Sequence, residues 1–294
     1  MSISAILIAN RGEIAIRIAR AAADLGLRTV AVYSEDDADS LHLRVADETQ
    51  ALSGLGAAAY LDMDGIITAA RAADCDAVHP GYGFLAERGD FASKCAEAGL
   101  TYIGPGVAHL DLFGDKARAR AAAVAADVPV LQGLDKAVTL EEATAFFEGQ
   151  IGGGAGGAMI IKAIAGGGGR GTRAVMAADE IAAAYDRCRS EAKAAFGRDE
   201  VYVEAFTPRA RHIEVQILGD KTGVVAHLGE RECSIQRRYQ KIVEIAPAPG
   251  LDDGLRQQII DAAVRFAESV EYTNLGTFEF LVDTTDQSFV FIET

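Results

Sequence analysis

The stretch Met159-Ile160-Ile161-Lys162-Ala163-Ile164-Ala165-Gly166-Gly167-Gly168-Gly169-Arg170-Gly171 decides the fold of this chain. Its short apolar run predicts a strand that fixes where Lys162 points, and four consecutive glycines follow. Because glycine has no Cβ, its backbone can take positive φ angles and bring N–H groups together around an anion. The stretch therefore indicates a flexible lid over the phosphates of a nucleotide. A hairpin or linker without a ligand is the alternative for this stretch alone.

The order of lysine and glycine in this stretch excludes two common nucleotide sites. In a P-loop the lysine follows the glycines, as Gly-x-x-x-x-Gly-Lys-Ser/Thr, whereas Lys162 precedes them. A dinucleotide fingerprint has the spacing Gly-x-Gly-x-x-Gly at the start of a helix, and this stretch does not. A nucleotide that binds here is therefore held in another way.

Composition limits the class of protein. A chain of 294 residues is long enough for two or three compact units. No apolar run reaches the roughly 18 residues of a membrane span, and no signal peptide opens the chain, so we expect no membrane partner. The net charge of −15 and the pI of about 4.8 argue against a nucleic-acid partner. The four cysteines form no C-x-x-C pair, which fits a cytoplasmic protein.

The first third of the chain alternates short apolar runs with helical patterns. Strands are expected at 5–9, 28–33, 50–52, 77–79 and 101–103, and helices after Glu13 and at about 62–73 and 89–98. This alternation predicts a parallel sheet that is covered on both faces. Segments 10–13 and 79–85 should then lie together at the carboxyl ends of the strands, where ligands bind in such sheets. Tight turns without a ligand are the alternative.

The middle of the chain predicts a small second unit around the glycine-rich stretch. Asp115 and Lys116 open an alanine-rich helix, in which Lys116 alone could equally be a solvated lysine. Thr139-Leu140-Glu141-Glu142 is a capping box that starts another helix. Gly152 to Gly157 has no nearby cation, so we expect a turn without a ligand there.

The last third is dominated by alternating strands. Segments 212–218 and 224–228 flank a turn and predict a β-hairpin with one solvated or ligand-facing side. Segment 230–241 follows and contains four cations in an otherwise acidic protein, which favours binding of a small anion. A solvated charged loop is the alternative for this segment.

The two closing strands, 277–282 and 289–293, predict a pair of neighbouring carboxylates. A five-residue loop would pair residue 283 with 289, 281 with 291, and Glu279 with Glu293. Directly opposed residues of an antiparallel pair share a face and lie about 5 Å apart. Two such carboxylates are costly unless a cation lies between them, and Mg²⁺ is commonly held in this way. A shift of the register by one residue would separate the pair.

Eight ordered motifs make the chain resemble the biotin carboxylase component of biotin-dependent carboxylases of the acetyl-CoA and propionyl-CoA type, within the ATP-grasp superfamily. The resemblance covers essentially the whole chain. The motifs lie at 8–15, 79–87, 113–116, 162–163 with the glycine stretch, 211–216, 232–238, 240–241 and 276–280. By this resemblance, residues 204–207 match the family's hinge at the edge of the adenine.

The resemblance implies an α/β fold with a Rossmann-like parallel-sheet domain at residues 1–113. An ATP-grasp fold follows, with a linker helix and a mobile glycine-rich lid at 114–204 and an incomplete C-terminal subdomain at 205–294. In the family, bicarbonate attacks the γ-phosphate of ATP to give carboxyphosphate, which carboxylates biotin on a carrier protein. The implied activity is therefore that of an ATP-dependent ligase.

The resemblance also assigns roles to individual residues of this sequence. Lys241 matches the catalytic lysine that binds bicarbonate, and Glu279 and Glu293 match the carboxylates that hold Mg²⁺ or Mn²⁺. The positions that match nucleotide contacts are Lys116, Lys162, Gly168, Gly169, Glu204, Ala205, Phe206, Thr207, His212, Gln236 and Tyr239.

Three departures from the family pattern put details in doubt. Ala205 stands where lysine is frequent, so one cationic contact near the nucleotide is lost. Tyr239 replaces a frequent histidine, which puts a nucleotide or phosphate contact at that position in doubt. The chain stops at Thr294 in mid-strand, before the family's third metal ligand, an arginine and the glutamate base. We therefore expect a partial chain that alone does not carboxylate biotin.

Partners follow from the same resemblance. Bicarbonate, a biotin carboxyl carrier protein or domain and a carboxyltransferase subunit are implied, and a homo-oligomer is compatible with it. Two alternatives stay open: another ATP-grasp ligase of the carbamoyl-phosphate-synthase kind, and a non-catalytic nucleotide-binding module. The first would use ammonia or an amine, and the second would tolerate loss of Lys162 or Glu279.

Overall fold

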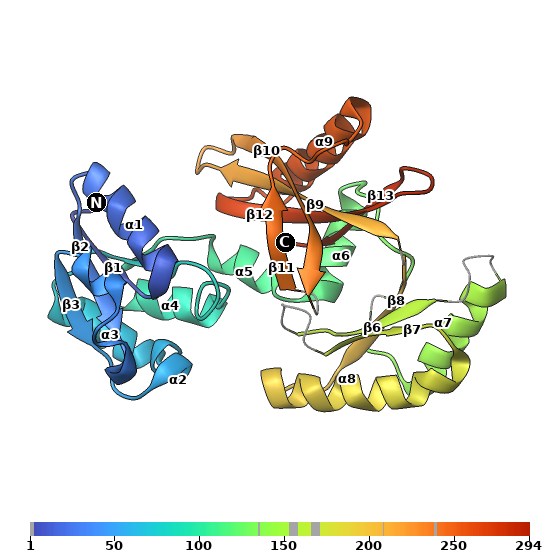
Figure 1. Cartoon of the computed structure of the whole chain (residues 1–294), viewed down its shortest axis with the longest axis horizontal. Coiled ribbons are helices and arrows are strands. Elements are labelled where there is room, and N and C mark those ends of the chain that lie inside the picture. The colour runs from blue at the N-terminus through green and yellow to red at the C-terminus, as the bar shows by residue number, and fades with distance from the viewer. Residues whose placement is uncertain (1–2, 135, 153–157, 166–170, 208, 238–239) are drawn as a thin grey trace. The chain divides into compact units, whose positions relative to one another are not determined.

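The computed structural model describes residues 3–134, 136–152, 158–165, 171–207, 209–237 and 240–294. The chain divides into two compact units, Met1–Asp111 and Leu112–Thr294 (Figure 1). The fold is mixed α/β, with a parallel sheet in the first unit and antiparallel sheets in the second, as the sequence predicts. The further division of the second unit at residue 204 stays a prediction. No helix of the described segments has the length and apolar character needed to cross a membrane.

The first unit alternates strands with helices. Its strands pair in parallel in the order β3-β2-β1-β4-β5, which confirms the predicted sheet. Its elements are β1 (Ala5–Ile8), α1 (Gly12–Asp24), β2 (Arg28–Tyr33), η1 (Glu35–Asp37), η2 (Leu41–Arg44), β3 (Glu48–Ala51), α2 (Gly56–Tyr60), α3 (Met63–Ala72), β4 (Ala77–His79), α4 (Gly89–Glu97) and β5 (Thr101–Tyr102).

The central strand β1 is buried on both of its faces, which explains why its sequence is apolar throughout. Leu7 packs into the cluster that contains Phe91 of α4. Ile8 packs on the other face against Ile18 of α1, and Ile6 packs against Ala22 of the same helix. A strand with helices on both sides cannot show the alternation of a half-exposed strand. The predicted covering of both faces is therefore confirmed.

The second unit contains two antiparallel sheets, ordered β7-β6-β8 and β11-β10-β9-β12-β13. The helix α5 (Val107–Phe113) leads into it from the first unit. The remaining elements are α6 (Lys116–Ala125), α7 (Leu140–Gly152), β6 (Met159–Ala163), β7 (Thr172–Val175), η3 (Ala178–Glu180), α8 (Ile181–Phe196), β8 (Val201–Ala205), β9 (Ala210–Gly219), β10 (Val225–Arg237), β11 (Gln240–Ile245), α9 (Asp253–Ser269), β12 (Asn274–Asp283) and β13 (Phe289–Glu293).

Alternation along β9 and β12 separates the core from a polar face of the larger sheet. Ile213 and Val215 of β9 and Phe278 and Phe280 of β12 lie in one buried cluster with the apolar face of α9. Successive side chains of a strand point to opposite faces. The intervening residues of both strands, including Glu279, therefore lie on the opposite face, where the candidate site is found.

The register of the closing hairpin differs from the regular pairing that the sequence predicts. Glu279 does pair with Glu293, as predicted. However, Phe280 pairs with Phe291, because Ile292 is an extra residue in a β-bulge, so the predicted pairs 281–291 and 283–289 are wrong. In a regular strand Glu293 would share the core face of Phe291. The bulge reverses this and puts Glu293 on the polar face with Glu279.

Candidate functional site

Lys116 is placed by the start of helix α6. The side chain of Asp115 accepts hydrogen bonds from the backbone N–H groups of Ala117 and Arg118, both at 3.1 Å, so the helix begins at Lys116. The Lys116 Nζ lies 3.3 Å from the Glu293 Oε2 at the end of β13. One predicted phosphate-binding lysine and one predicted metal-binding carboxylate are therefore in contact.

Lys162 projects from the outer face of the small sheet β7-β6-β8. Met159 and Ile161 of β6 are buried in the core beneath that sheet, so Lys162 points the other way. Its Nζ lies 2.6 Å from the Oε2 of Glu204 on the neighbouring strand β8, and 93% of the Glu204 side chain is buried. The two charges therefore compensate each other in a largely dry environment.

Lys241 connects two carboxylates on the polar face of the larger sheet. Its Nζ lies 2.7 Å from the Glu279 Oε1 and also donates to the Glu214 Oε2. Glu214 and Glu279 are direct cross-strand partners on β9 and β12, which puts their side chains on the same face. Glu214 is 98% buried, so the ammonium of Lys241 is needed there to compensate charge.

His212 joins this cluster from β9. Its Nε2 lies 2.6 Å from the Glu279 Oε2, and its Nδ1 lies 2.7 Å from the Nε2 of Gln236 on β10. Because the Gln236 amide nitrogen can only donate, the Nδ1 of His212 must accept, and the imidazole proton is then on Nε2. This tautomer donates a hydrogen bond to Glu279. Gln236 thus orients His212, and His212 orients Glu279.

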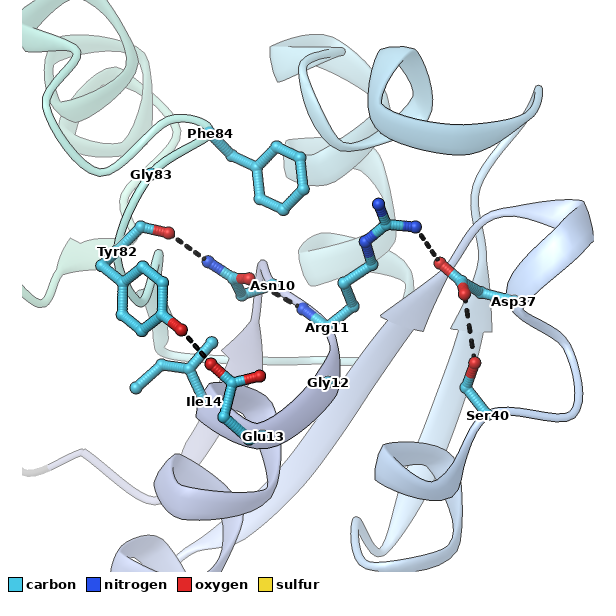
Figure 2. Close-up of a pocket in the computed structure, with 10 residues that line it drawn as sticks. All are labelled: Asn10, Arg11, Gly12, Glu13, Ile14, Asp37, Ser40, Tyr82, Gly83 and Phe84. Atoms are coloured by element: carbon cyan, nitrogen blue, oxygen red, sulfur yellow. Dashed lines mark hydrogen bonds and ion pairs between the residues drawn. The ribbon is translucent and has the colours of Figure 1, made fainter. Parts of the chain in front are cut away.

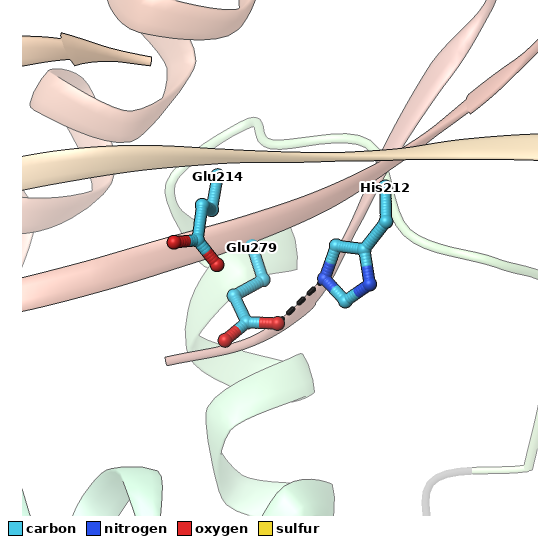
Figure 3. Close-up of side chains that lie close together, drawn as sticks. All are labelled: His212, Glu214 and Glu279. Atoms are coloured by element: carbon cyan, nitrogen blue, oxygen red, sulfur yellow. Dashed lines mark hydrogen bonds and ion pairs between the residues drawn. The ribbon is translucent and has the colours of Figure 1, made fainter. Parts of the chain in front are cut away.

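Two groups of side chains that include Glu279 could hold a metal ion. The ligand atoms of His212, Glu214 and Glu279 all lie within 4.8 Å of one another (Figure 3). However, this group includes a histidine nitrogen, and Mg²⁺ prefers a set of oxygen ligands. Glu279 and Glu293, paired across β12 and β13, provide oxygens only. This pair therefore fits Mg²⁺ or Mn²⁺ better than the histidine-containing group.

The predicted hinge continues directly from β8. The backbone N–H of Ala205 donates to the Gln132 carbonyl at 2.7 Å, and that of Phe206 donates to the Ala158 carbonyl at 3.2 Å. These bonds tie Ala205 and Phe206 to neighbouring segments, next to Glu204 and its contact with Lys162. Ala205 adds only a methyl group, so its side chain brings no cation to this edge. Gly168, Gly169 and Tyr239, which the sequence also assigns to the site, lie outside the described residues.

The lysines and carboxylates stabilise each other's charged forms. Burial lowers the pKa of Lys162, but Tyr202 and Glu204 outweigh it, so the pKa is raised. Burial likewise lowers the pKa of Lys241, but Glu279 and Glu214 outweigh it, and this pKa is also raised. Lys116 lowers the pKa of Glu293. At neutral pH Lys162, Lys241 and Glu293 are therefore charged.

Acid should weaken the fold through Glu214. Burial raises the pKa of Glu214, but Lys241 and Arg231 outweigh it, so its folded pKa lies below the unfolded value of about 4.3. Such a group stabilises the fold above the unfolded pKa, and this contribution is lost as the pH falls through the folded pKa. In urea unfolding, Glu214→Gln should therefore cost about 1–3 kcal/mol at pH 7, and the cost should shrink below about pH 4.3.

A matched variant controls for general effects of removing a negative charge. Glu268 is exposed near the end of α9. Glu268→Gln should change the free energy of unfolding by less than about 0.5 kcal/mol at every pH. A constant difference between Glu214→Gln and the unmodified protein from pH 7 to pH 3 would contradict the assigned ionisation of Glu214.

Two residues of this cluster were missed by sequence reasoning. Glu214 lies two residues after His212 on a strand that alternates, so period-two alternation alone places it on the same face. Arg231 lies in the charged segment after the hairpin, and nothing in that segment distinguishes it from the other cations. Its contact with Glu214 follows from the pairing of the two residues across β9 and β10.

The first unit has a separate crevice of about 500 Å³ at the carboxyl ends of its strands (Figure 2). It brings together segments 10–14 and 82–84, which confirms that the two predicted segments lie at one rim. Arg11 donates to Asp37 at 2.8 Å, and its guanidinium lies 5.3 Å from the centre of the Tyr60 ring. The Asn10 side chain donates to the Pro80 and Tyr82 carbonyls.

Comparison with known families agrees with this arrangement. Residues 2–110 match the family described as biotin carboxylase, N-terminal domain. Residues 115–294 match the family described as carbamoyl-phosphate synthase L chain, ATP binding domain. The chain belongs to the biotin carboxylase family. Its second unit is accordingly an ATP-grasp domain, which confirms the resemblance that the sequence motifs indicate.

Individual biotin carboxylase relatives are similar over the whole chain. Pyruvate carboxylase of Bacillus subtilis is 53% identical over 99% of this chain, and biotin carboxylase 1 of the same organism is 44% identical over 99%. The crystal structure of a biotin carboxylase–ATP-analogue complex from Campylobacter jejuni superposes with a TM-score of 0.93 at 43% identity, and covers 99% of this chain and 65% of that chain.

A further biotin carboxylase structure was solved with ligands. The biotin carboxylase domain of 2-oxoglutarate carboxylase from Hydrogenobacter thermophilus, in complex with MgADP, ADP and bicarbonate, gives a TM-score of 0.94 at 41% identity, and covers 100% of this chain and 64% of that chain. The present chain spans 25% of the Bacillus subtilis pyruvate carboxylase and 64% of biotin carboxylase 1. It therefore corresponds to part of the length of these relatives.

Proposed function

We propose that this chain provides the ATP- and bicarbonate-binding part of a biotin carboxylase. The observation that carries the proposal is the convergence of Lys116, Lys162 and Lys241 with Glu279 and Glu293 in one unit. The three lysines provide ammonium donors that anionic oxygens of a substrate could accept from. The membership of the biotin carboxylase family supports the same activity.

In this proposal, Lys116 and Lys162 bind the phosphates of ATP. Each ammonium is held within 3.3 Å of a carboxylate, so its position is already set before a phosphate oxygen accepts from it. Segment 204–207 provides an extended edge for the adenine, and Gly168 and Gly169 would cover the phosphates as part of the lid. His212 and Gln236 contact the nucleotide from the larger sheet.

Glu279 and Glu293 would hold Mg²⁺ or Mn²⁺ between the carboxylates and the phosphates. The metal ion supplies charge neutralisation at the phosphate oxygens during transfer of the γ-phosphoryl group. Neighbouring side chains position the two carboxylates of this pair. His212 donates to Glu279 at 2.6 Å, and the Lys116 Nζ lies 3.3 Å from Glu293, so both carboxylates are held in position.

Lys241 would bind bicarbonate and hold it in line with the γ-phosphate. A bicarbonate oxygen attacks the phosphorus, the bond to the β-phosphate oxygen breaks, and ADP leaves with the bonding electron pair. The product, carboxyphosphate, has a C–O–P linkage. Carbon dioxide or the carboxyl group then replaces the proton on a ureido nitrogen of biotin, that proton passes to a base or to the released phosphate, and inorganic phosphate keeps the bridging oxygen. Cations around the transferred group lower the cost of its negative charge.

The partners of the whole protein are proposed on the same basis. Biotin would be presented by a carrier protein or domain, and a carboxyltransferase would pass the carboxyl group to an acceptor. A homo-oligomer is compatible with the family, because one similar structure is described as a dimer of biotin carboxylase domains. The four cysteines are free and buried, which supports a cytoplasmic protein.

The test is ATP cleavage by the protein at its natural full length, measured with different second substrates. A biotin carboxylase should release ADP with bicarbonate and accelerate when biotin is added. A ligase of the carbamoyl-phosphate-synthase kind should instead respond to ammonia and ignore biotin. MgADP binding without any turnover by the full-length protein would favour the non-catalytic module and contradict the proposal.

A further inference from the structure

Arg231 on β10 is fixed against Glu214 from several sides. Its Nε and Nη2 lie 2.6 and 2.5 Å from the Glu214 Oε1. Its Nη1 donates to the Gln216 Oε1 at 3.1 Å, and its Nη2 donates to the Thr277 Oγ1 at 3.3 Å. These three partners lie on the polar face of β9 and β12, so the guanidinium is locked in the plane that contacts the carboxylate.

Glu214 divides its two oxygens between two cations. Oε1 accepts from Arg231, and Oε2 accepts from Lys241. The carboxylate is 98% buried, so little water reaches it and its charge is compensated by these two side chains. The position of Lys241 is therefore set by a carboxylate whose own orientation depends on Arg231.

The charge count at Lys241 shows what Arg231 contributes. Lys241 contacts two carboxylates, Glu214 and Glu279, so these three groups alone sum to one negative charge. Arg231 brings the sum to zero. Bicarbonate is an anion, and a net negative charge next to it would repel it strongly in a partly buried site. A site without Arg231 would therefore oppose the ligand that Lys241 is proposed to bind.

We propose that Arg231 is the positioning residue of the bicarbonate site, which neutralises Glu214 and thereby keeps the ammonium of Lys241 available to the anion. This inference rests on the proposed function. Arg231 acts through Glu214, so loss of Arg231 should weaken the binding of bicarbonate far more than the binding of nucleotide. The exposed Glu244 also contacts this arginine, with its Oε2 3.7 Å from the Arg231 Nε.

The test compares steady-state bicarbonate and ATP dependence of ATP cleavage in the full-length protein. Arg231→Gln should raise the KM for bicarbonate roughly tenfold or more, with the KM for ATP changed less than about threefold. Arg231→Lys keeps the positive charge but not the planar guanidinium. Its KM for bicarbonate should lie between those of Arg231→Gln and the unmodified protein. Arg231→Gln combined with Glu214→Gln removes both charges, so it should lower the KM for bicarbonate again towards the starting value.

Arg256→Gln is the matched control. Arg256 on α9 also holds a buried glutamate, Glu230, at 2.9 Å, but neither residue contacts Lys241 in the structure. This variant should lose stability while its KM for bicarbonate is unchanged. Equal effects of Arg231→Gln on both substrates, or no recovery in the Arg231→Gln/Glu214→Gln double variant, would overturn the role of Arg231.

The proposed function is tested separately by Lys241→Met. If Lys241→Met abolishes the response to bicarbonate but Arg231→Gln leaves the KM for bicarbonate unchanged, only the role of Arg231 is wrong. If Lys241→Met itself responds to bicarbonate normally, the bicarbonate site has been misplaced and both proposals fail.

Discussion

Replacing Lys162 by methionine should weaken MgATP binding by about 10–100-fold, because each hydrogen bond to a charged group contributes about 1.5–3 kcal/mol. Lys162 follows the apolar residues Met159 to Ile161 in β6, and 85% of its side chain is buried. Loss of its ammonium removes a proposed donor to the phosphates. It also leaves the anionic carboxylate of Glu204 at the nucleotide site, where it repels phosphate. Isothermal titration calorimetry of the chain with MgATP or MgADP measures the effect.

Stability must be separated from binding in this variant. An unpaired buried carboxylate costs about 3–5 kcal/mol, so Lys162→Met alone should also destabilise the fold. Lys162→Met combined with Glu204→Gln removes both charges and should recover most of the stability, but it should not recover MgATP affinity. Lys221→Met, in the exposed turn between β9 and β10, controls for the loss of one lysine. Normal MgATP affinity in the stable double variant would contradict the assignment of Lys162.

Replacing Lys241 by methionine should reduce bicarbonate-dependent ATP cleavage by about 10²–10³-fold, the loss expected when a preorganised electrostatic partner of the reacting group is removed. MgADP affinity should change less than about threefold, because Lys116 and Lys162 are the lysines proposed to bind the phosphates. Kinetics of ADP release against bicarbonate concentration, together with MgADP titration, separate the two effects. Equal losses of nucleotide binding and of the response to bicarbonate would indicate that Lys241 binds the nucleotide instead.

Local sequence signals predicted much of the architecture. The side chain of Asp115 caps α6 and thereby places Lys116 in its first turn, as its position before an alanine-rich run suggests. The capping box at Thr139 is present, with the Glu142 N–H donating to the Thr139 hydroxyl at 3.3 Å and the Thr139 N–H donating to the Glu142 side chain at 2.9 Å. These signals act within one or two turns of chain, so a single sequence contains them completely.

The arrangement of the polar face needed three-dimensional information. The bulge at Ile292 has no signal in the sequence, and it decides on which face Glu293 lies. The segment around Arg231 could be a solvated charged loop by composition, but it is part of the 13-residue strand β10. Contacts such as Arg231 with Glu214 depend on the pairing of β9 with β10, which alternation along one strand does not specify.

The origin of the oxygen atoms in the phosphate product tests the central claim most directly. The full-length protein is given ¹⁸O-labelled bicarbonate and unlabelled ATP, with and without biotin, and the inorganic phosphate is analysed by mass spectrometry before bicarbonate exchanges its oxygens with water. If bicarbonate at Lys241 attacks the γ-phosphate, each phosphate formed by this route contains one ¹⁸O atom from bicarbonate. Phosphate without ¹⁸O would show that water attacks instead, and would contradict the proposed biotin carboxylase reaction.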